Sequence, residues 1–484
     1  MSSIFEGLKP SHLWKHFEQI LKIPHDSGDE TALGDYIISV AERFNLAWKR
    51  DNIGNVVVEK KATPGHENAE GVILQGHIDM VCEKNSDVVH DFTKDAIKTE
   101  IKGDWMQAIG TTLGSDNGIG LAASLAIMED TDLEHGPLEF LFTVDEETGL
   151  TGATKIEADF LKGRIFLNLD SEDEGVFTIG CAGGADSEIT FPLQRKEPGV
   201  GDLYRLKIFG LRGGHSGIDI SQGRGNAILF LTQMLSESKE EFPFELVRME
   251  GGNKRNAIAR EAWADLIVDP AQSQSLFSSL QETFEKLHSE FSAVEKEAKF
   301  SFEKSDEQKE DTLLPDTNNT LLHLLSSLPH GVIAMHPEIE GLVETSTNLA
   351  IIHTHEDHVQ IICSSRSAVA SQLKATRDKI LQTSEHVGAK VFQPEGYPGW
   401  TPNLQSPLLK TLKEVHLKTF QKEAKVEAIH AGLECGIIGE KFPGMDMISF
   451  GPTIEHPHSP EERVHIGSVE TFWTFLSEVL AELA

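Results

Sequence analysis

Apolar and polar positions alternate with two different periods along the first part of the chain. Apolar residues recur at helical spacing over residues 13–46, and a run of small and apolar residues over 120–128 also predicts a helix. Short apolar runs that end in polar clusters predict buried strands, and these runs cover residues 55–59, 71–75, 138–143 and 164–169. Because strands and helices alternate, we expect an α/β sheet whose ligands gather at the carboxyl ends of its strands.

The pattern changes at residues 191–202, which are typical of a linker, and a new order of elements then occurs twice. The first round has helices at 225–236 and 272–291 and strands at 204–209, 244–250 and 257–268. The second round has helices at 321–328 and 370–386 and strands at 344–352, 358–363 and 389–393. This repetition predicts two related α+β units packed together, although the two halves share no visible sequence identity.

Beyond residue 399 the pattern returns to α/β, with helices at 408–422 and 469–483 and strands at 426–430 and 447–450. We therefore predict a discontinuous α/β domain formed by residues 1–190 and 399–484, and an inserted α+β domain formed by residues 191–398. The length of 484 residues agrees with this division, because single hydrophobic cores seldom serve more than about 250–300 residues.

The net charge of the chain limits the classes of partner that it can be expected to bind. Lys and Arg number 43 against 77 Asp and Glu, which gives a formal net charge of -34. Such a surface repels phosphate backbones and anionic membranes, so neither nucleic acid nor a membrane is an expected partner. Carboxylates are also ligands that divalent metals prefer, and the 21 histidines strengthen that possibility.

The spacing of the cysteines and the composition of the N-terminal residues bear on the cellular compartment in which the protein works. The four cysteines lie far apart without a CxxC pair, which excludes a disulfide framework or a structural zinc finger and favours a reducing environment. The N-terminal residues lack the apolar segment of a signal peptide, and no apolar run approaches the roughly 18 residues of a membrane span. We expect a cytoplasmic protein.

Carboxylates and histidines follow several of the predicted strands. His77 and Asp79 come directly after the strand at 71–75. An HxD motif alone is weak evidence, but both side chains point to the same side of an extended segment, so one can bind a metal while the other orients it. Asp116 lies in a glycine-rich turn before a helix, where a helix N-cap is the ordinary interpretation.

Three further segments have the same character. Glu146 and Glu147 belong to an acidic run after the strand at 138–143; a solvated turn is the simple interpretation, yet so many adjacent carboxylates repel one another unless a cation lies among them. Asp170 follows another strand, and His458 lies in a loop near the C-terminus, where His456 is a competing candidate. Two histidines and three carboxylates at one sheet edge form the ligand set of a hydrolytic site with two metal ions.

Nine motifs together make the chain resemble the M20 metallopeptidases, from about residue 10 to the C-terminus. The motifs are HIDM, GSDNGIG, EETG, LDSE, GGHSG, GGNKRNAI, SSRS, HAGLECG and GPTIEHPHSP. The resemblance implies a two-domain α/β fold, in which a discontinuous catalytic domain with a zinc-peptidase-like sheet carries an inserted α+β lid domain. It implies the metal-dependent hydrolysis of unblocked dipeptides, with a broad specificity that includes Xaa-His dipeptides.

The resemblance also implies a role for each residue of the metal site. His77 and Asp170 would hold one ion, Glu147 and His458 the other, and Asp116 would bridge the two. The ions would be Zn²⁺, with Mn²⁺ or Co²⁺ able to substitute. Two further residues would be catalytic without binding metal: Asp79 would orient His77, and Glu146 would act as the general base. Glu146 stays off the metals if the pair lies on an extended segment, where neighbouring side chains point in opposite directions.

The inserted domain would supply the substrate contacts. By resemblance, His215 would stabilise the tetrahedral oxyanion, Asn256 and Arg366 would grip the substrate, and Gly432 would let the backbone approach it. Without the resemblance, His215 would be an ordinary loop histidine and Arg366 a surface ion pair. Cys435 has no basic neighbour in sequence that would lower its pKa, so a buried small residue is the favoured interpretation.

Two alternatives remain open from the sequence. A deacylase of N-acyl amino acids would use the same dinuclear site, and a noncatalytic metal-dependent binding protein would need no general base. The family also suggests a homodimer. In relatives with a lid about half this size, the oxyanion histidine would come from the neighbouring subunit; here the doubled insert predicts that His215 acts within its own chain.

Overall fold

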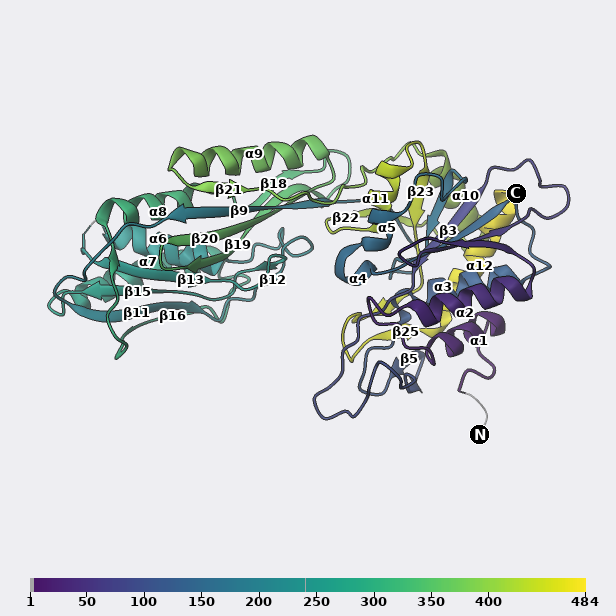
Figure 1. The fold of residues 1–484 in the computed structure, drawn as a ribbon, viewed down its shortest axis with the longest axis horizontal. Helices are drawn as coiled ribbons and strands as arrows, with labels where there is room; N and C mark the ends of the chain where they lie inside the picture. The colour runs from purple at the N-terminus through teal and green to yellow at the C-terminus, as the bar shows by residue number, and fades with distance from the viewer. Residues whose placement is uncertain (1–3, 240) are drawn as a thin grey trace. The chain divides into compact units, whose positions relative to one another are not determined.

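The computed structural model describes residues 4–239 and 241–484, which fold into two compact units (Figure 1). Unit 1 comprises the chain up to Cys181, Trp400–Ala428 and Leu433–Ala484, and unit 2 comprises Ala182–Gly399 and Ile429–Gly432. Within the described ranges, no helix combines the length and the apolar character that a membrane span requires.

Unit 1 is built on an eight-stranded sheet with the order β1-β2-β6-β3-β7-β23-β8-β22. In the same order, these strands are Ala47–Arg50, Val56–Lys60, Leu138–Thr143, Val72–His77, Ile165–Asn168, Asp446–Ser449, Val176–Cys181 and Lys425–Ile429. The four central strands, β6, β3, β7 and β23, are parallel to one another. Their carboxyl ends therefore lie along one edge of the sheet.

Helices cover this sheet and complete the core of unit 1. They are α1 (Ser11–Ile20), α2 (Thr31–Arg43), α3 (Ser115–Glu129), α10 (Pro407–Phe420), α11 (Glu434–Lys441) and α12 (Ile466–Glu482), with the short α4 (Glu146–Gly149) and α5 (Thr151–Lys155). Helix α3 is buried on all sides, because its residues are almost all small or apolar. A small sheet, β24-β25-β5-β4, adds Ile454–Glu455, Arg463–His465, Trp105–Ala108 and Thr99–Lys102.

Unit 2 contains a nine-stranded antiparallel sheet with the order β16-β11-β15-β13-β19-β20-β9-β21, and β18 pairs with β19. In that order the strands are Lys299–Lys304, Asp202–Phe209, Ala262–Val268, Glu245–Gly251, Val343–Thr354, His358–Ser367, Gly183–Pro192, Lys390–Phe392 and, for β18, Gly331–Met335. Four helices pack on it: α6 (Ala227–Lys239), α7 (Ser273–Phe291), α8 (Pro315–Ser327) and α9 (Ala370–His386). Two-stranded ribbons pair β10 (Arg195–Lys196) with β17 (Thr312–Leu313) and β12 (Gly214–His215) with β14 (Ala257–Ile258).

The two predicted rounds of elements in the insert contribute to one continuous sheet. The rounds meet where β13 pairs with β19, through only two residue pairs, Glu250 with His353 and Gly251 with Ile352. Strands β16 and β18 were not predicted; both are largely exposed or half-buried in the structure.

The first predicted domain boundary, at residue 190, differs from the structure. Unit 2 already begins at Ala182, because β9 pairs with β20 from Gly183 to Pro192. The hydrophobic pattern of β9 does not reveal which sheet it joins. The α/β fold with an inserted α+β unit is otherwise as predicted.

Candidate metal centre

The carboxyl ends of the parallel strands in unit 1 bring the predicted metal ligands together. His77 is the last residue of β3, Asp170 follows β7, Glu147 follows β6 and His458 follows β23. Asp116 enters from the N-terminal end of α3. A Cβ atom at Gly76 would lie 2.1 Å from the Asn117 side-chain oxygen; only glycine therefore lets α3 begin this close to β3.

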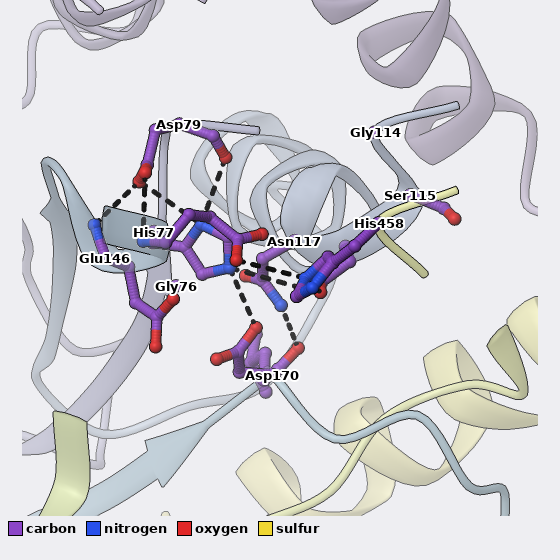
Figure 2. Close-up of polar contacts among 12 residues, drawn as sticks. Gly76, His77, Asp79, Gly114, Ser115, Asn117, Glu146, Asp170 and His458 are labelled. Carbon is purple, nitrogen blue, oxygen red and sulfur yellow. Dashed lines mark hydrogen bonds and ion pairs between the residues drawn. The ribbon is translucent and has the colours of Figure 1, made fainter. Parts of the chain in front are cut away.

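The ligand atoms form two groups that share Asp116. In the first group, His77 Nε2 lies 3.2 Å from Asp116 Oδ1 and 3.2 Å from Asp170 Oδ1. In the second, His458 Nε2 lies 3.2 Å from Asp116 Oδ2 and 3.0 Å from Glu147 Oε2. Figure 2 shows His77 between Asp79 and Asp170. Each oxygen of Asp116 thus faces one histidine, as a bridging carboxylate requires.

The spacing and charge of these atoms fit two divalent ions. Two ligand atoms about 2.0–2.2 Å from one zinc ion, at a tetrahedral angle, are separated by roughly 3.3–3.6 Å, close to the 3.0–3.2 Å found here. Within the described part of the chain, Glu147 Oε1 is buried without a hydrogen-bond partner. Burial raises the pKa of Asp170 to about 7, and hydrogen bonds to Asp116 and Glu147 raise the pKa of His458 to about 11. The clustered carboxylates therefore attract positive charge, which bound cations would supply in place of these protons.

Asp79 holds both His77 and the loop that carries the two glutamates. Its Oδ1 lies 3.4 Å from His77 Nδ1, and its carboxylate accepts hydrogen bonds from the backbone N–H groups of Glu146 and Glu147 at 3.0 and 3.1 Å. Although burial acts to raise it, the pKa of Asp79 is held at about 2 by His77 and these hydrogen bonds. A carboxylate that remains ionised fixes the orientation of the His77 ring.

Glu146 lies beside the ligands, in a group with His77 and Glu147. Burial raises the pKa of its carboxyl well above the ordinary value. Glu146 and Glu147 do not lie on the extended segment that was expected from the sequence; both begin the one-turn helix α4. Their side chains therefore diverge by the roughly 100° between neighbouring helical positions rather than by a strand's alternation.

Of the two histidines in the last loop, only His458 belongs to a ligand group. Both residues have a positive φ, 56° for His456 and 60° for His458. From the sequence, only the family resemblance favoured His458 over His456, because the turn that aims the His458 ring at Asp116 depends on neighbouring loops.

Glu462 is a buried residue of the site that sequence reasoning missed. Its carboxylate accepts hydrogen bonds from the backbone N–H groups of Leu113, Gly114 and Ser115 at 2.7, 3.0 and 2.7 Å, and from Ser115 Oγ at 2.6 Å. Because Glu462 follows His458 by four residues, it ties the two ligand loops together. The only sequence signal is the adjacent pair Glu461 and Glu462, which does not reveal which one is buried.

A second buried carboxylate, Glu434, lies below the site at the start of α11. It accepts hydrogen bonds from Gln75 Nε2 at 2.6 Å and Thr143 Oγ1 at 2.7 Å. Gln75 and Thr143 lie on β3 and β6, the strands that lead to His77 and to the acidic run. Glu434 thereby joins the two strand ends, and the motif HAGLECG gave no hint of this role.

Replacing Glu462 with glutamine is expected to weaken metal binding by about 10–100-fold, the usual cost of losing a group that orients ligands. The amide NH₂ would face backbone N–H donors, so stability should also fall by about 1–3 kcal/mol. Metal content after dialysis and the thermal midpoint measure the two effects. Glu461→Gln, at an exposed neighbour, is the matched control. Unchanged metal affinity in Glu462→Gln would contradict the assignment.

Unit 2 places the predicted oxyanion histidine in a defined tautomer. His215 Nδ1 accepts hydrogen bonds from the backbone N–H groups of Gly217 and Ile218, at 3.2 and 3.1 Å. The proton of the neutral ring must then be on Nε2, which is a donor. Burial and the charge of Arg366 lower the pKa of His215 to about 4, so the ring is neutral at pH 7.

Arg366 is buried in unit 2 and is held by an aromatic hydroxyl. It is 8% exposed, and its Nη1 donates to Tyr397 Oη at 2.7 Å. A buried guanidinium is unlike the surface ion pair that was the alternative interpretation. A Cβ atom at Gly432 would lie 2.8 Å from the Tyr397 ring, so this glycine gives room to the residue that holds Arg366. Tyr397 was not identified from the sequence.

Asn256 and Cys435, the other two residues singled out from the sequence, differ in exposure. Asn256 is exposed, and its backbone carbonyl accepts a hydrogen bond from Ser216 N at 2.8 Å. Cys435 is completely buried, and burial raises the pKa of its thiol well above the ordinary value. A thiol in this state is not a nucleophile.

Acidification from pH 7 to pH 5 is expected to destabilise unit 2. Burial lowers the pKa of His330 to about 4, whereas an unfolded histidine titrates near 6.5. Between these values the unfolded state binds more protons, so stability is present near pH 7 and falls as the pH drops through this window. Urea midpoints at the two pH values measure the loss. His330→Asn should reduce the pH dependence, and an unaltered dependence would exclude this histidine as a cause.

Fold and site together define a class of protein: a two-unit α/β hydrolase with two candidate metal-ligand groups that share one carboxylate. The chain belongs to Peptidase family M20/M25/M40, whose sequence profile matches residues 73–482. The predicted family resemblance is thus confirmed, and the chain is a peptide hydrolase.

Comparisons with individual proteins agree with this family assignment. The chain is 41% identical over 478 residues, 98% of each chain, to the cytosol non-specific dipeptidase of Escherichia coli (strain K12). Its sequence is 40% identical to that of aminoacylhistidine dipeptidase from Vibrio alginolyticus. The crystal structure of that protein matches with a TM-score of 0.91 over 99% of this chain and 98% of that one. Aminopeptidase PepT from Bacillus cereus, at 14% identity and a TM-score of 0.58 over 98% and 99% of the two chains, shares the fold.

Proposed function

We propose that this chain hydrolyses unblocked dipeptides at a site with two divalent ions, and that its broad specificity includes Xaa-His dipeptides. The observation that carries the proposal is the pair of ligand groups that share Asp116, with Glu146 beside them. The names of the Escherichia coli and Vibrio relatives support the substrate class.

The chain's own residues divide the work of hydrolysis. Bound divalent ions would polarise the peptide carbonyl and make water more acidic. Glu146 takes a proton from the attacking water and later gives it to the leaving amine nitrogen. Asp79 keeps His77 and the glutamate loop in place through the contacts described above. Glu146 acts as base because its side chain is close to the ligands while Glu147 completes the second ligand group.

We propose zinc as the native metal, with activity recoverable by manganese or cobalt. One histidine with two carboxylates per ion suits zinc, while carboxylate-rich sites also accept these other ions. Elemental analysis of protein purified without added metal tests the proposal. Chelator treatment should abolish hydrolysis, and protein that contains no transition metal yet remains active would refute it.

Four residues of unit 2 complete the proposed reaction. The Nε2–H of His215 is the donor for the oxyanion, and Arg366 pairs with the free carboxylate of the dipeptide. Asn256 contacts the substrate and Gly432 lets backbone approach it. The defined tautomer of His215 supports the first role. Both His215 and Arg366 act only if unit 2 reaches the metal centre during turnover.

Comparing free and N-acetylated dipeptides tests the substrate class. A dipeptidase should cleave the free peptides and reject the acetylated ones, whereas a deacylase of N-acyl amino acids should release acetate. The comparisons do not favour the deacylase. A noncatalytic metal-dependent binding protein would bind dipeptides in the presence of metal without cleaving them.

We also propose a cytoplasmic homodimer in which His215 serves the metal centre of its own chain. Mixing inactive Glu146→Ala and inactive His215→Ala proteins under subunit exchange tests the last point. Donation within one chain predicts no recovered activity, because each chain keeps its own defect. Substantial recovery in mixed dimers would show that His215 acts across the subunits.

A further inference from the structure

Three histidines lie together at the end of the β19–β20 hairpin in unit 2, and none of them belongs to the metal centre of unit 1. His353 lies near the end of β19, His355 in the turn and His358 at the start of β20. His355 N donates to His358 O at 2.8 Å, which closes the turn. The His355 ring contacts both others, with ring centroids 4.4 Å from His353 and 4.3 Å from His358.

Carboxylates hold the two outer rings by the same nitrogen. His353 Nδ1 lies 2.6 Å from Glu250 Oε2, and His358 Nδ1 lies 2.7 Å from Asp357 Oδ1. Histidines that bind metals commonly donate their other ring N–H to a carboxylate, which sets the tautomer and the ring orientation. In both rings this arrangement leaves Nε2 as the nitrogen available to a metal.

Packing does not explain the cluster. The side chains of His353 and His358 are 50% and 31% exposed, so their burial contributes little to stability. Three adjacent imidazoles would repel one another when protonated. A shared cation bound by neutral rings gives the arrangement a physical reason.

The cluster also lies where the strand pairing of the unit 2 sheet is shortest among the described residues. The two halves of the sheet meet through two residue pairs of β13 and β19, and one of these pairs joins Glu250 to His353. Glu250 Oε1 additionally accepts a hydrogen bond from Thr354 N at 3.0 Å. An ion held here would connect β13, β19 and β20.

We propose that His353, His355 and His358 form a surface site for a borderline divalent transition ion, Zn²⁺, Ni²⁺ or Cu²⁺, with Glu250 and Asp357 orienting the outer rings. Imidazole nitrogens suit these ions, whereas Mg²⁺ and Ca²⁺ require oxygen ligands. The His355 and His358 rings are stacked at 21°, so the nitrogens of the three rings do not converge as they stand. Binding turns the His355 ring about its side-chain torsions, while His353 and His358 keep their carboxylate contacts. The site stabilises the junction of the two sheet halves.

Equilibrium dialysis of the full chain against Zn²⁺, followed by elemental analysis, counts the ions bound. Wild type should hold one more ion per chain than His355→Gln, and Zn²⁺ should raise the thermal midpoint of wild type more than that of the variant. His386→Gln, which removes an exposed histidine elsewhere in unit 2, should retain the wild-type count. Equal counts in wild type and His355→Gln would overturn the proposal.

Two further measurements test whether the three histidines bind one ion together rather than independently. Electron paramagnetic resonance with Cu²⁺ should show a species with several nitrogen ligands that is lost in His355→Gln. Glu250→Gln should weaken that species about 10–100-fold in affinity, while its amide oxygen can still accept from Thr354 N. An unaltered Cu²⁺ affinity in Glu250→Gln would refute the orienting role. Dipeptide hydrolysis and circular dichroism should be unchanged in His355→Gln, which shows that the variant folds.

Discussion

Asp116→Asn protein is expected to lose both metal ions and, with them, its hydrolytic activity. Asp116 belongs to both ligand groups, and its two oxygens face different histidines at 3.2 Å each. An asparagine side chain has one acceptor oxygen and no charge, so it cannot serve two ions. We expect metal affinity to fall by more than the 10–100-fold seen when an orienting partner is lost.

Elemental analysis after dialysis measures this loss for both ions at once. Asp173→Asn, at an exposed carboxylate close in sequence to Asp170, is the matched control and should keep its metal. Circular dichroism establishes that the variant folds. If Asp116→Asn retains two ions per chain, the bridging assignment is wrong.

Glu146→Gln protein is expected to keep both ions while its turnover falls by about 10²–10⁴-fold, the contribution of a general base. Glutamine has nearly the shape of glutamate but cannot take a proton at neutral pH. The backbone N–H of residue 146 still donates to Asp79, so the loop should remain in place. Turnover and metal content must be measured on the same preparation.

Glu147→Gln is the comparison variant: here metal content should fall, whereas in Glu146→Gln only turnover should fall. Its carboxylate lies 3.0 Å from His458 Nε2, so the change should reduce metal content by one ion. Loss of metal in Glu146→Gln would show that the two neighbouring residues have been assigned the wrong way round.

The amino-acid sequence by itself determined the elements of the fold and the residue types of the site. The helix predicted over residues 370–386 is α9, and the strand predicted over 138–143 is β6. These elements follow from hydrophobic periodicity, which is a local property. The five candidate ligands were also proposed from the sequence, because ligands of α/β folds follow the strands and because the motifs are those of a known family; the structure brings their side chains together.

Only the tertiary structure decided which of several similar residues takes part. Glu461 and Glu462 are equivalent in sequence, but Glu462 is the one buried against the backbone of residues 113–115. Such choices depend on groups hundreds of positions away, and no local pattern encodes them.

Strand pairing and the contacts that hold side chains were likewise decided by the tertiary structure. Strand β9 joins the sheet of unit 2 because β20 pairs with it, and Tyr397 holds Arg366 only because the fold brings the two together. The two rounds of elements in the insert form one sheet through the pairing of Glu250 with His353. Periodicity states which face of a strand is buried, whereas its neighbours are set by the packing of the whole chain.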